Sequence, residues 1–353
     1  MADARGKKVL PILQDLYSES TYAVDVGCTS LREPLGLGDV IEVADIASLT
    51  VNASGSVTAS PEAVTTSVLS LNANLEPWIN AALPKMASIQ LLDSGNWAEQ
   101  VSRQSVLMLK NSLDENLFAY LQENNFSTSA AYHTNVSGDS LTAGDLATAI
   151  ATLTDNRGVS VESLALFVSA WGRASIQSIS SFIPNGSEAE RGGLGIPRVG
   201  TVYGVPVFST SAVSNGREVA STAWSSDGTD ITITVPTSCG IVPGMKILWS
   251  TATSTHDVVT STAVDTATTT TIVLPDPLAS SGSATEAGTI TIQASENILV
   301  DINNTYVAQQ ELPTVEVVKL SDQTGSSLQV SAIWGRVARA GYANILCSPK
   351  SAA

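Results

Sequence analysis

The spacing of apolar residues changes several times along the chain, and each change predicts a different element. The longest helical pattern lies between residues 96 and 124, where apolar positions recur three and four residues apart. These positions are Val101, Val106, Leu109, Leu113, Leu117, Tyr120 and Leu121. Asn96 and Glu99 resemble a capping box at the start of the pattern. We expect one amphipathic helix about 42 Å long, with its apolar stripe facing a core.

The preceding segment, residues 38–72, has the pattern of a long β-hairpin. Two stretches rich in Val, Ile, Leu and Thr flank a small polar segment that contains Gly55 and Pro61. A two-stranded ribbon is marginally stable alone in water, so this one must rest on its own subunit or on a neighbour. Residues 1–37 show no sustained period, and we expect an arm that crosses a surface and adds no core element.

Residues 142–169 combine a second helix with a buried strand. Thr142 and Asp145 predict the start of a helix over 142–156, and Gly158 predicts its end. The apolar run LALFVS at 164–169 follows, and then a short helix. This order of elements indicates a compact α+β unit.

The stretch GIPRVGTVYGVPVFST, residues 195–210, predicts two strands joined by a tight turn. Gly200 and Gly204 are expected to let the strands turn, while Pro197 and Pro206 stiffen the local chain. None of its side chains suits acid, base or nucleophilic catalysis. The stretch therefore predicts a shape and no reaction.

From residue 217 to 294 the chain is rich in Thr, Ser and Ala and predicts only strands. Four runs at 231–235, 245–250, 268–274 and 289–293 are separated by Pro and Gly, as in a small β-sandwich or barrel. Strand patterns resume from residue 296 to 347. We therefore expect a small, acidic all-β domain inserted into a larger α+β protein.

Composition excludes several classes of function. The chain has 353 residues, 17 Lys and Arg against 33 Asp and Glu, and a net charge of -16, which opposes tight, sequence-independent binding to nucleic acid. No apolar run reaches the roughly 20 residues of a membrane span, and the apolar part of the N-terminus is too short for a signal peptide. The widely spaced Cys28, Cys239 and Cys347 are expected to be reduced, in a protein that folds in a cytoplasm.

The sequence shows no constellation typical of an enzyme. Its two histidines, His133 and His256, lie far apart, and the zinc-protease, nucleophile-elbow and phosphate-loop patterns are missing. The glycines at 193–200 have the wrong spacing for dinucleotide binding and precede a strand. We expect neither an enzyme nor a bound cofactor or metal ion.

The order of arm, long hairpin, long helix, α+β unit and returning strands resembles the major capsid proteins of tailed bacteriophages. Their shell fold is named after bacteriophage Hong Kong 97. The run from Gly195 to Val207 is similar to the axial-domain hairpin of that family. The resemblance implies an N-terminal arm at 1–37, an extended loop at 38–72, a peripheral domain at 73–135 with a spine helix at 96–124, an axial domain at 136–213, an inserted β domain at 214–295, and a return to the axial and peripheral domains at 296–353.

The resemblance also implies a function and partners. The chain would assemble into the pentamers and hexamers of an icosahedral head, in the host cytoplasm, around double-stranded DNA that it encloses without binding tightly. The arm is too short to include a scaffolding segment, so a separate scaffolding protein is implied, with a portal and a decoration protein as further partners. The candidate intersubunit contacts are Val51, Asn52, Gly55, Val57, Glu188, Arg191 and Arg198.

One family feature is not matched. Some members join subunits by an amide bond from a lysine on the extended loop, but this chain has no lysine between Lys8 and Lys85. Covalent cross-linking from the hairpin is therefore not expected.

Two other functions remain open. An encapsulin-like compartment has the same shell fold and houses a protein cargo. A Thr- and Ser-rich surface-layer or adhesion protein would account for residues 214–295, although the long helix and the missing signal peptide count against it. Nucleic acid or protein cargo inside purified particles would separate the first alternative from a virus head.

Overall fold

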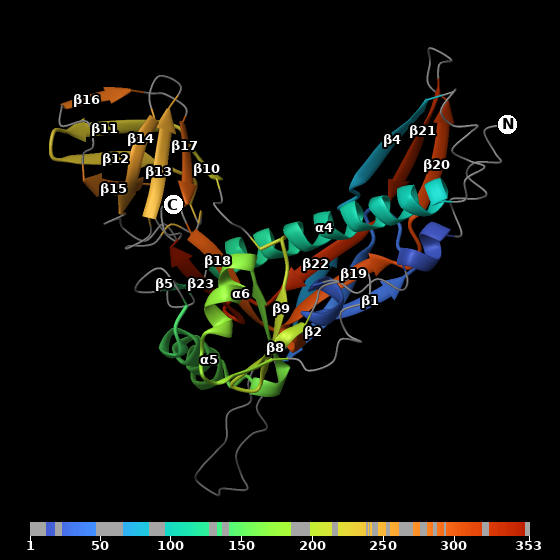
Figure 1. The fold of residues 1–353 in the computed structure, drawn as a ribbon, viewed down its shortest axis with the longest axis horizontal. Helices are drawn as coiled ribbons and strands as arrows, with labels where there is room; N and C mark the ends of the chain where they lie inside the picture. Colours follow the sequence, from blue (N-terminus) through green and yellow to red (C-terminus); the bar gives the residue numbers. More distant parts are fainter. Residues whose placement is uncertain are drawn as a thin grey trace, which may run out of the picture.

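The computed structural model has a mixed α/β architecture, as the sequence predicts. Its longest helix, α4 (Asn96–Phe126), runs beside the sheets of a main body, and a separate group of strands lies beyond one end of that helix (Figure 1). The structure describes residues 12–17, 23–46, 66–84, 96–126, 133–135, 141–184, 198–213, 218–237, 239, 241, 246–251, 255–260, 271–275, 281–284, 288–292, 294–319 and 325–349.

A seven-stranded sheet forms the centre of the main body. In order across the sheet, its strands are β5 (His133–Asn135), β23 (Ala343–Pro349), β18 (Ala294–Asp301), β6 (Leu164–Val168), β9 (Val205–Ser209), β8 (Arg198–Val202) and β7 (Phe182–Pro184). β6 lies between β18, which is antiparallel to it, and β9, which is parallel. The chain thus leaves the sheet at β9 and returns at β18, only two strand positions away.

Different helices cover the two faces of this sheet. The even-numbered side chains of β6 pack in one core with α5 (Ala143–Arg157) and α6 (Ala170–Gln177). Its odd-numbered side chains pack in another core with α4, where the ring centroids of Phe118 and Phe167 are 5.2 Å apart. A strand that is buried on both faces needs a continuous apolar run, which explains the sequence LALFV.

Helix α5 begins and ends where the sequence predicts. The Thr142 hydroxyl accepts a hydrogen bond from the Asp145 backbone N–H, and the Asp145 carboxylate accepts one from the Thr142 N–H at 3.0 Å. At the other end, Gly158 adopts a φ of 66°, and its N–H donates to the carbonyl oxygens of Leu153 and Thr154. Both ends of the helix are therefore capped by local sequence.

Helix α4 confirms the predicted long helix and extends two residues beyond it. Val101 and Tyr120 of the predicted stripe are half-buried, and the other five members are buried: Val106, Leu109, Leu113, Leu117 and Leu121. The same side of the helix also buries the charged residues Lys110 and Asp114. The Asn96 and Glu99 side chains of the expected capping box lie outside the described residues.

The predicted hairpin at 195–210 is confirmed for its described part, as β8 and β9. Tyr203 and Gly204 form the turn with φ angles of 51° and 82°. Gly200 has a different role from the expected one, because it lies within β8 and pairs with Pro184 of β7. A Cβ atom at Gly200 would lie 2.3 Å from the Ile183 carbonyl oxygen, so this glycine permits the close approach of two strands and makes no turn.

Two three-stranded sheets complete the main body. One contains β1 (Thr29–Glu33), β19 (Thr305–Gln310) and β22 (Trp334–Ala338), and the other contains β20 (Thr314–Lys319), β21 (Gly325–Ser331) and β4 (Trp78–Pro84). β1 pairs with β19 in the parallel direction. Strands from the two ends of the chain are thereby joined in one sheet.

The N-terminal segment contributes to the core, contrary to the expectation of a surface arm. Leu13 and Tyr17 are fully buried in a cluster that contains Val106 and Leu109 of α4. Ala23, at the start of the short helix α2 (Ala23–Val26), is also fully buried. These elements are too short to produce a recognisable period, and their burial depends on partners far along the chain.

The described strands between residues 218 and 292 form two four-stranded sheets, and none of these strands also belongs to a sheet of the main body. The first contains β10 (Glu218–Ser221), β17 (Gly288–Ile292), β13 (Lys246–Thr251) and β14 (Thr255–Thr260), and the second contains β15 (Thr271–Pro275), β12 (Asp230–Thr234), β11 (Ala223–Asp227) and β16 (Ser281–Ala284). Alternate residues of both sheets are buried, and Trp224 and Trp249 meet edge to face at 5.9 Å between ring centroids. This is the lobe beyond the end of α4 in Figure 1.

Candidate functional site

The β2–β3 hairpin is the first candidate site, because it forms a sheet of only two strands. β2 (Val40–Ile46) and β3 (Thr66–Asn72) pair in antiparallel register from Val40–Asn72 to Ile46–Thr66, within the predicted hairpin. At its base, the Gly38 N–H donates to the Ala73 carbonyl and the Ala73 N–H donates to the Asp39 carbonyl, both at 2.8 Å. The hairpin therefore leaves the main body from a closed, hydrogen-bonded root.

The hairpin root packs on the sheet that contains β19 and β22. Its cluster contains five buried residues: Leu35, Leu71, Ala73, Ala308 and Val337. A Cβ atom at Gly335 of β22 would lie 2.4 Å from the Asn72 carbonyl oxygen, so β22 approaches β3 as closely as a glycine allows. Leu75, just after the root, forms a two-way backbone bridge with Trp334. The root is thus fixed to the body through β22.

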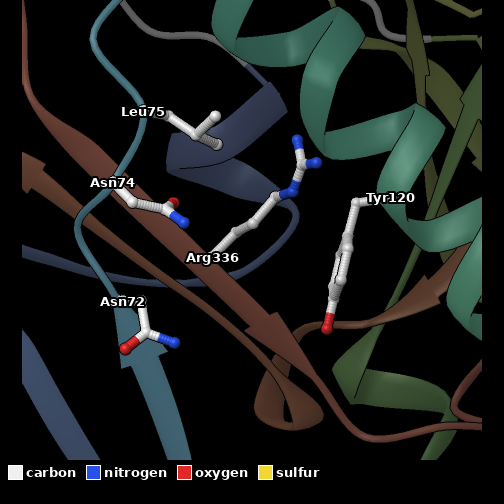
Figure 2. A pocket seen from close by; sticks show the side chains of 5 residues that line it. All are labelled: Asn72, Asn74, Leu75, Tyr120 and Arg336. Atoms are coloured by element: carbon white, nitrogen blue, oxygen red, sulfur yellow. The ribbon is translucent and has the colours of Figure 1, made fainter.

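A cavity of about 250 Å³ lies between the root, α4 and β22. Asn72, Asn74 and Leu75 line one side, Tyr120 of α4 lies opposite, and the Arg336 side chain of β22 extends between them (Figure 2). Arg336 is the single charged residue of this lining, and the two asparagines are exposed. The lining therefore carries one guanidinium and two side-chain amides.

Arg336 also connects β22 to the long helix. Its guanidinium donates through Nη1 to the Asn116 carbonyl oxygen, and it lies 4.9 Å from the Tyr120 ring centroid and 5.4 Å from that of Trp334. The Tyr120 hydroxyl accepts a hydrogen bond from the Ala338 N–H at 3.4 Å. These contacts fix the direction of the guanidinium between β22 and α4.

A second polar cluster joins the N-terminal segment to α4. Lys110 Nζ lies 3.4 Å from an Asp25 carboxylate oxygen and 4.4 Å from the Tyr17 ring centroid. The Gln309 side-chain amide of β19 donates to Asp25 at 2.9 Å, and its oxygen accepts from the Tyr17 hydroxyl at 3.4 Å. The Asp114 carboxylate accepts the Ala23 N–H at 3.1 Å. We call Tyr17, Asp25, Lys110, Asp114 and Gln309 the N-terminal anchor.

The Cys28 thiol beside this anchor is expected to resist alkylation. Burial, followed by the negative charges of Asp25 and Asp114, raises the pKa of Cys28 well above its ordinary value. Because only the thiolate reacts, iodoacetamide at pH 8 should leave the Cys28 peptide unmodified in the native protein and modify it in urea. Mass spectrometry of the peptides measures this difference. Equal rates in both conditions would contradict it.

The structure leaves most of the predicted contact residues untested. Val51, Asn52, Gly55 and Val57 at the hairpin tip, and Glu188 and Arg191 in the glycine-rich loop, lie outside the described residues. Arg198 is exposed at the start of β8, opposite Phe208 of β9. It belongs to the seven-stranded sheet, whereas the cavity lies at the hairpin root.

The residues weighed for catalysis are spread over the molecule. His133 lies in β5 at one edge of the seven-stranded sheet, and His256 lies in β14 at one edge of a sheet of the separate lobe. Within the described ranges, no three His, Cys, Asp or Glu side chains gather as metal ligands. Cys28 and Cys239 are buried thiols. None of the helices described is long and apolar enough to cross a membrane.

Neither the cavity nor the N-terminal anchor is predicted from the sequence. For the anchor a signal existed, because Lys110 and Asp114 are an i, i+4 pair of opposite charge on the apolar side of a helix. Two opposite charges on the apolar side of a helix indicate that both charges are buried. Buried charges need partners on another element, which here is the N-terminal segment. The cavity had no local signal, since Asn74, Tyr120 and Arg336 are far apart in the sequence.

Comparison with known proteins gives structural matches only. No family model and no curated protein matches the chain. It is similar to a solved structure from Gordonia phage Cozz, with a TM-score of 0.48, 9% identity and coverage of 94% of this chain and 87% of that chain. A structure from Microbacterium phage Oxtober96 gives a TM-score of 0.46, 11% identity and coverage of 94% of this chain and 92% of that chain. The capsid structure of cyanophage P-SCSP1u gives a TM-score of 0.42, 10% identity and coverage of 92% of this chain and 87% of that chain.

Proposed function

We propose that this chain is the major capsid protein of a tailed bacteriophage, and that its copies assemble into the shell of the virus head. The proposal rests on the architecture and on the motifs that carry the family resemblance. A long helix, a rooted two-stranded hairpin and a seven-stranded sheet occur here in the family's order along the chain.

The β2–β3 hairpin is the observation that carries the proposal. Among the described sheets it is the only one with two strands, and such ribbons are marginally stable in water. Leu37 and Val40 at its base are 61% and 55% exposed. A ribbon that is fixed firmly at its root and carries exposed apolar residues is suited to lie on another surface. In a shell, that surface belongs to the neighbouring subunit.

The family's regions are proposed for this chain with the boundaries expected from the sequence. Residues 38–72 are the extended loop, α4 is the spine helix of the peripheral domain, and the seven-stranded sheet with α5 and α6 is the axial domain. Residues 214–295 are the inserted domain. Its two ends meet the sheet at β9 and β18, which both pair with β6, so an added domain fits there without interrupting the sheet.

Assembly would follow from repetition of weak contacts. Heterologous surfaces on each subunit close into pentamers and hexamers, and each subunit is held by several neighbours at once. An acidic subunit encloses double-stranded DNA without binding it tightly, because phosphates are repelled and not neutralised. A separate scaffolding protein, a portal and a decoration protein remain proposed partners.

Negative-stain electron microscopy of the purified chain, alone and with a scaffolding protein, tests the proposed function. We expect rings of five or six subunits and closed shells. Monomers that form neither under any condition would overturn the proposal. Closed shells that enclose a protein cargo and no nucleic acid, when isolated from the native host, would favour the encapsulin-like alternative.

A further inference from the structure

We infer that the base of the β2–β3 hairpin docks on the open face of β7 and β8 in a second copy of this chain. The inference deepens the proposed function and rests on it, because it assigns one contact between neighbouring shell subunits. The hairpin-base patch is defined by Leu37, Asp39, Val40 and Glu42. The sheet-edge patch is defined by Ile183, Arg198, Thr201 and Tyr203.

Exposed large apolar side chains occur in pairs at these two places. Leu37 and Val40 at the hairpin base are 61% and 55% exposed. Ile183 of β7 and Tyr203 of the β8–β9 turn are 67% and 44% exposed. Elsewhere in the described part of the chain such side chains occur singly: Met108 in α4, Trp171 in α6 and Leu312 after β19. Single exposed apolar residues are ordinary on a protein surface, whereas grouped ones mark interaction sites.

The hairpin-base patch is ordered before anything binds to it. The Asp39 N–H donates to the Gly36 carbonyl at 3.1 Å, and the Gly36 N–H donates to the Asp39 carboxylate at 2.6 Å. Leu37 therefore lies in a closed turn. Val40 and Glu42 are two positions apart in β2 and both are exposed, so they lie on the same side of the strand. Docking would cost little backbone entropy at such a surface.

The sheet-edge patch lies on the side of the seven-stranded sheet that α4 covers further in. Ile183 pairs with Thr201, and Thr201 pairs with Pro206 of β9. Arg198 pairs with Phe208, which is two positions after Pro206 and packs in the core beneath α4. Because paired residues and alternate residues of a strand share one side of the sheet, Ile183, Thr201 and Arg198 lie on this same side. Ile183 and Arg198 are exposed there, so the face is open at β7 and β8.

The two patches are complementary in charge as well as in apolar character. The hairpin-base patch carries the exposed carboxylates of Asp39 and Glu42, and the sheet-edge patch carries the exposed guanidinium of Arg198. Complementary charges around an apolar contact set the register between partners and disfavour wrong ones. Docking would bury the two apolar pairs against each other and place Glu42 against Arg198 at their rim.

The partner is a second copy because both patches are exposed in the same molecule. Their exposure shows that neither patch covers the other within one copy. Two different and complementary patches on one chain make a heterologous contact, which closes a ring when it is repeated by rotation. Each hairpin base would then meet the sheet edge of the next subunit around a pentamer or hexamer.

Reversal of the two charges tests this contact. Glu42→Lys opposes Arg198 of the next copy with a second cation, and Arg198→Glu opposes Glu42 with a second carboxylate. We expect each single variant to raise the protein concentration needed for shell formation about tenfold. The double variant Glu42→Lys with Arg198→Glu restores the attraction in the opposite sense and should return to within about threefold of the unmodified chain. Light scattering and electron microscopy over a concentration series measure this, and equal midpoints in urea show that the variants are folded.

A matched double variant separates pairing from net charge. Glu115→Lys with Arg198→Glu has the same net charge as the restoring variant, but Glu115 is an exposed residue of α4 outside both patches. It should assemble as poorly as Arg198→Glu alone. Normal assembly of the single variants, no recovery with Glu42→Lys, or equal recovery with Glu115→Lys would overturn the inference and leave the proposed function intact. An unmodified chain that forms neither rings nor shells would overturn the proposed function itself.

A cross-linking experiment shows which residues meet and in what sense. Assembled protein with both Glu42→Cys and Arg198→Cys is treated with a short bismaleimide, because Glu and Arg side chains would hold their Cβ atoms too far apart for a disulfide. We expect a ladder of linked subunits that ends at five or six. Each single substitution should give no more product than the unmodified chain, whose Cys28 and Cys239 are buried. Linked dimers from one single variant, or no ladder from the double variant, would contradict the head-to-tail contact.

Discussion

Replacing Lys110 by methionine should lower the free energy of unfolding by about 3–5 kcal/mol, the usual cost of removing one partner of a buried ion pair. Lys110 is fully buried, and its ammonium lies against Asp25 and the Tyr17 ring. Methionine fills a similar volume but leaves the Asp25 and Asp114 carboxylates in the interior without that positive charge. Urea denaturation followed by tryptophan fluorescence, with both proteins in the same assembly state, measures the loss.

The double variant Lys110→Met with Asp25→Asn is the control for this prediction. With both charges of the pair removed, much of the lost stability should return, because the penalty comes from the unpaired carboxylate. The single variant should also expose the N-terminal segment to proteases sooner, since the N-terminal anchor links that segment to α4. A single variant that loses less than about 1 kcal/mol would place Lys110 outside the groups that determine stability.

Replacing Gly335 by alanine should displace the hairpin root and prevent normal shell assembly. The new Cβ would lie 2.4 Å from the Asn72 carbonyl oxygen and 2.8 Å from the Asn72 carbonyl carbon, so the backbone of β3 or β22 must move. We expect a loss of about 1–3 kcal/mol, as for other overpacked sites. We also expect faster hydrogen exchange at the Gly38 and Ala73 amides, whose hydrogen bonds close the root. Hydrogen exchange read by mass spectrometry measures the opening, and electron microscopy measures assembly.

Gly144→Ala provides the matched control. A Cβ at Gly144 in α5 would have only the Thr142 hydroxyl within 4 Å, at 3.8 Å, so the same change should be neutral or stabilising by about 0.5–1 kcal/mol. Gly335→Ala with unchanged exchange at the root and normal shells would show that the close approach of β22 to β3 does not hold the hairpin.

Local sequence was enough to predict the elements whose structure depends on local physics. The caps at Thr142 and Gly158 use residues three to five positions away, and the buried strand 164–168 is recognisable because both of its faces are covered. A long segment with apolar residues three and four positions apart can also be predicted from local sequence, as α4 shows. These parts of the fold follow from hydrogen bonding and burial within one short stretch of chain.

The parts that could not be predicted depend on partners far along the chain. Nothing in residues 12–33 indicates that Tyr17 will meet Gln309, or that β1 will find β19, 272 residues after its own end. Gly200 was misread for the same reason, because its crowding comes from Ile183 of a strand that pairs only in the folded state. The cavity between the hairpin root, α4 and β22 is lined by three separate segments, and none of these segments alone indicates it.

The parallel pairing of β1 with β19 has a consequence for how the chain is made. Translation proceeds at about 5–20 residues per second, so roughly 15–55 seconds separate the synthesis of β1 from that of its partner strand. Until then the Asp25 carboxylate lacks its hydrogen bond from Gln309, and the hairpin root lacks β22. A nascent chain that lacks β19 and β22 thus has an unpaired β1 and an incomplete hairpin root. Only a subunit in which both of these late strands have been made can hold the root against the main body.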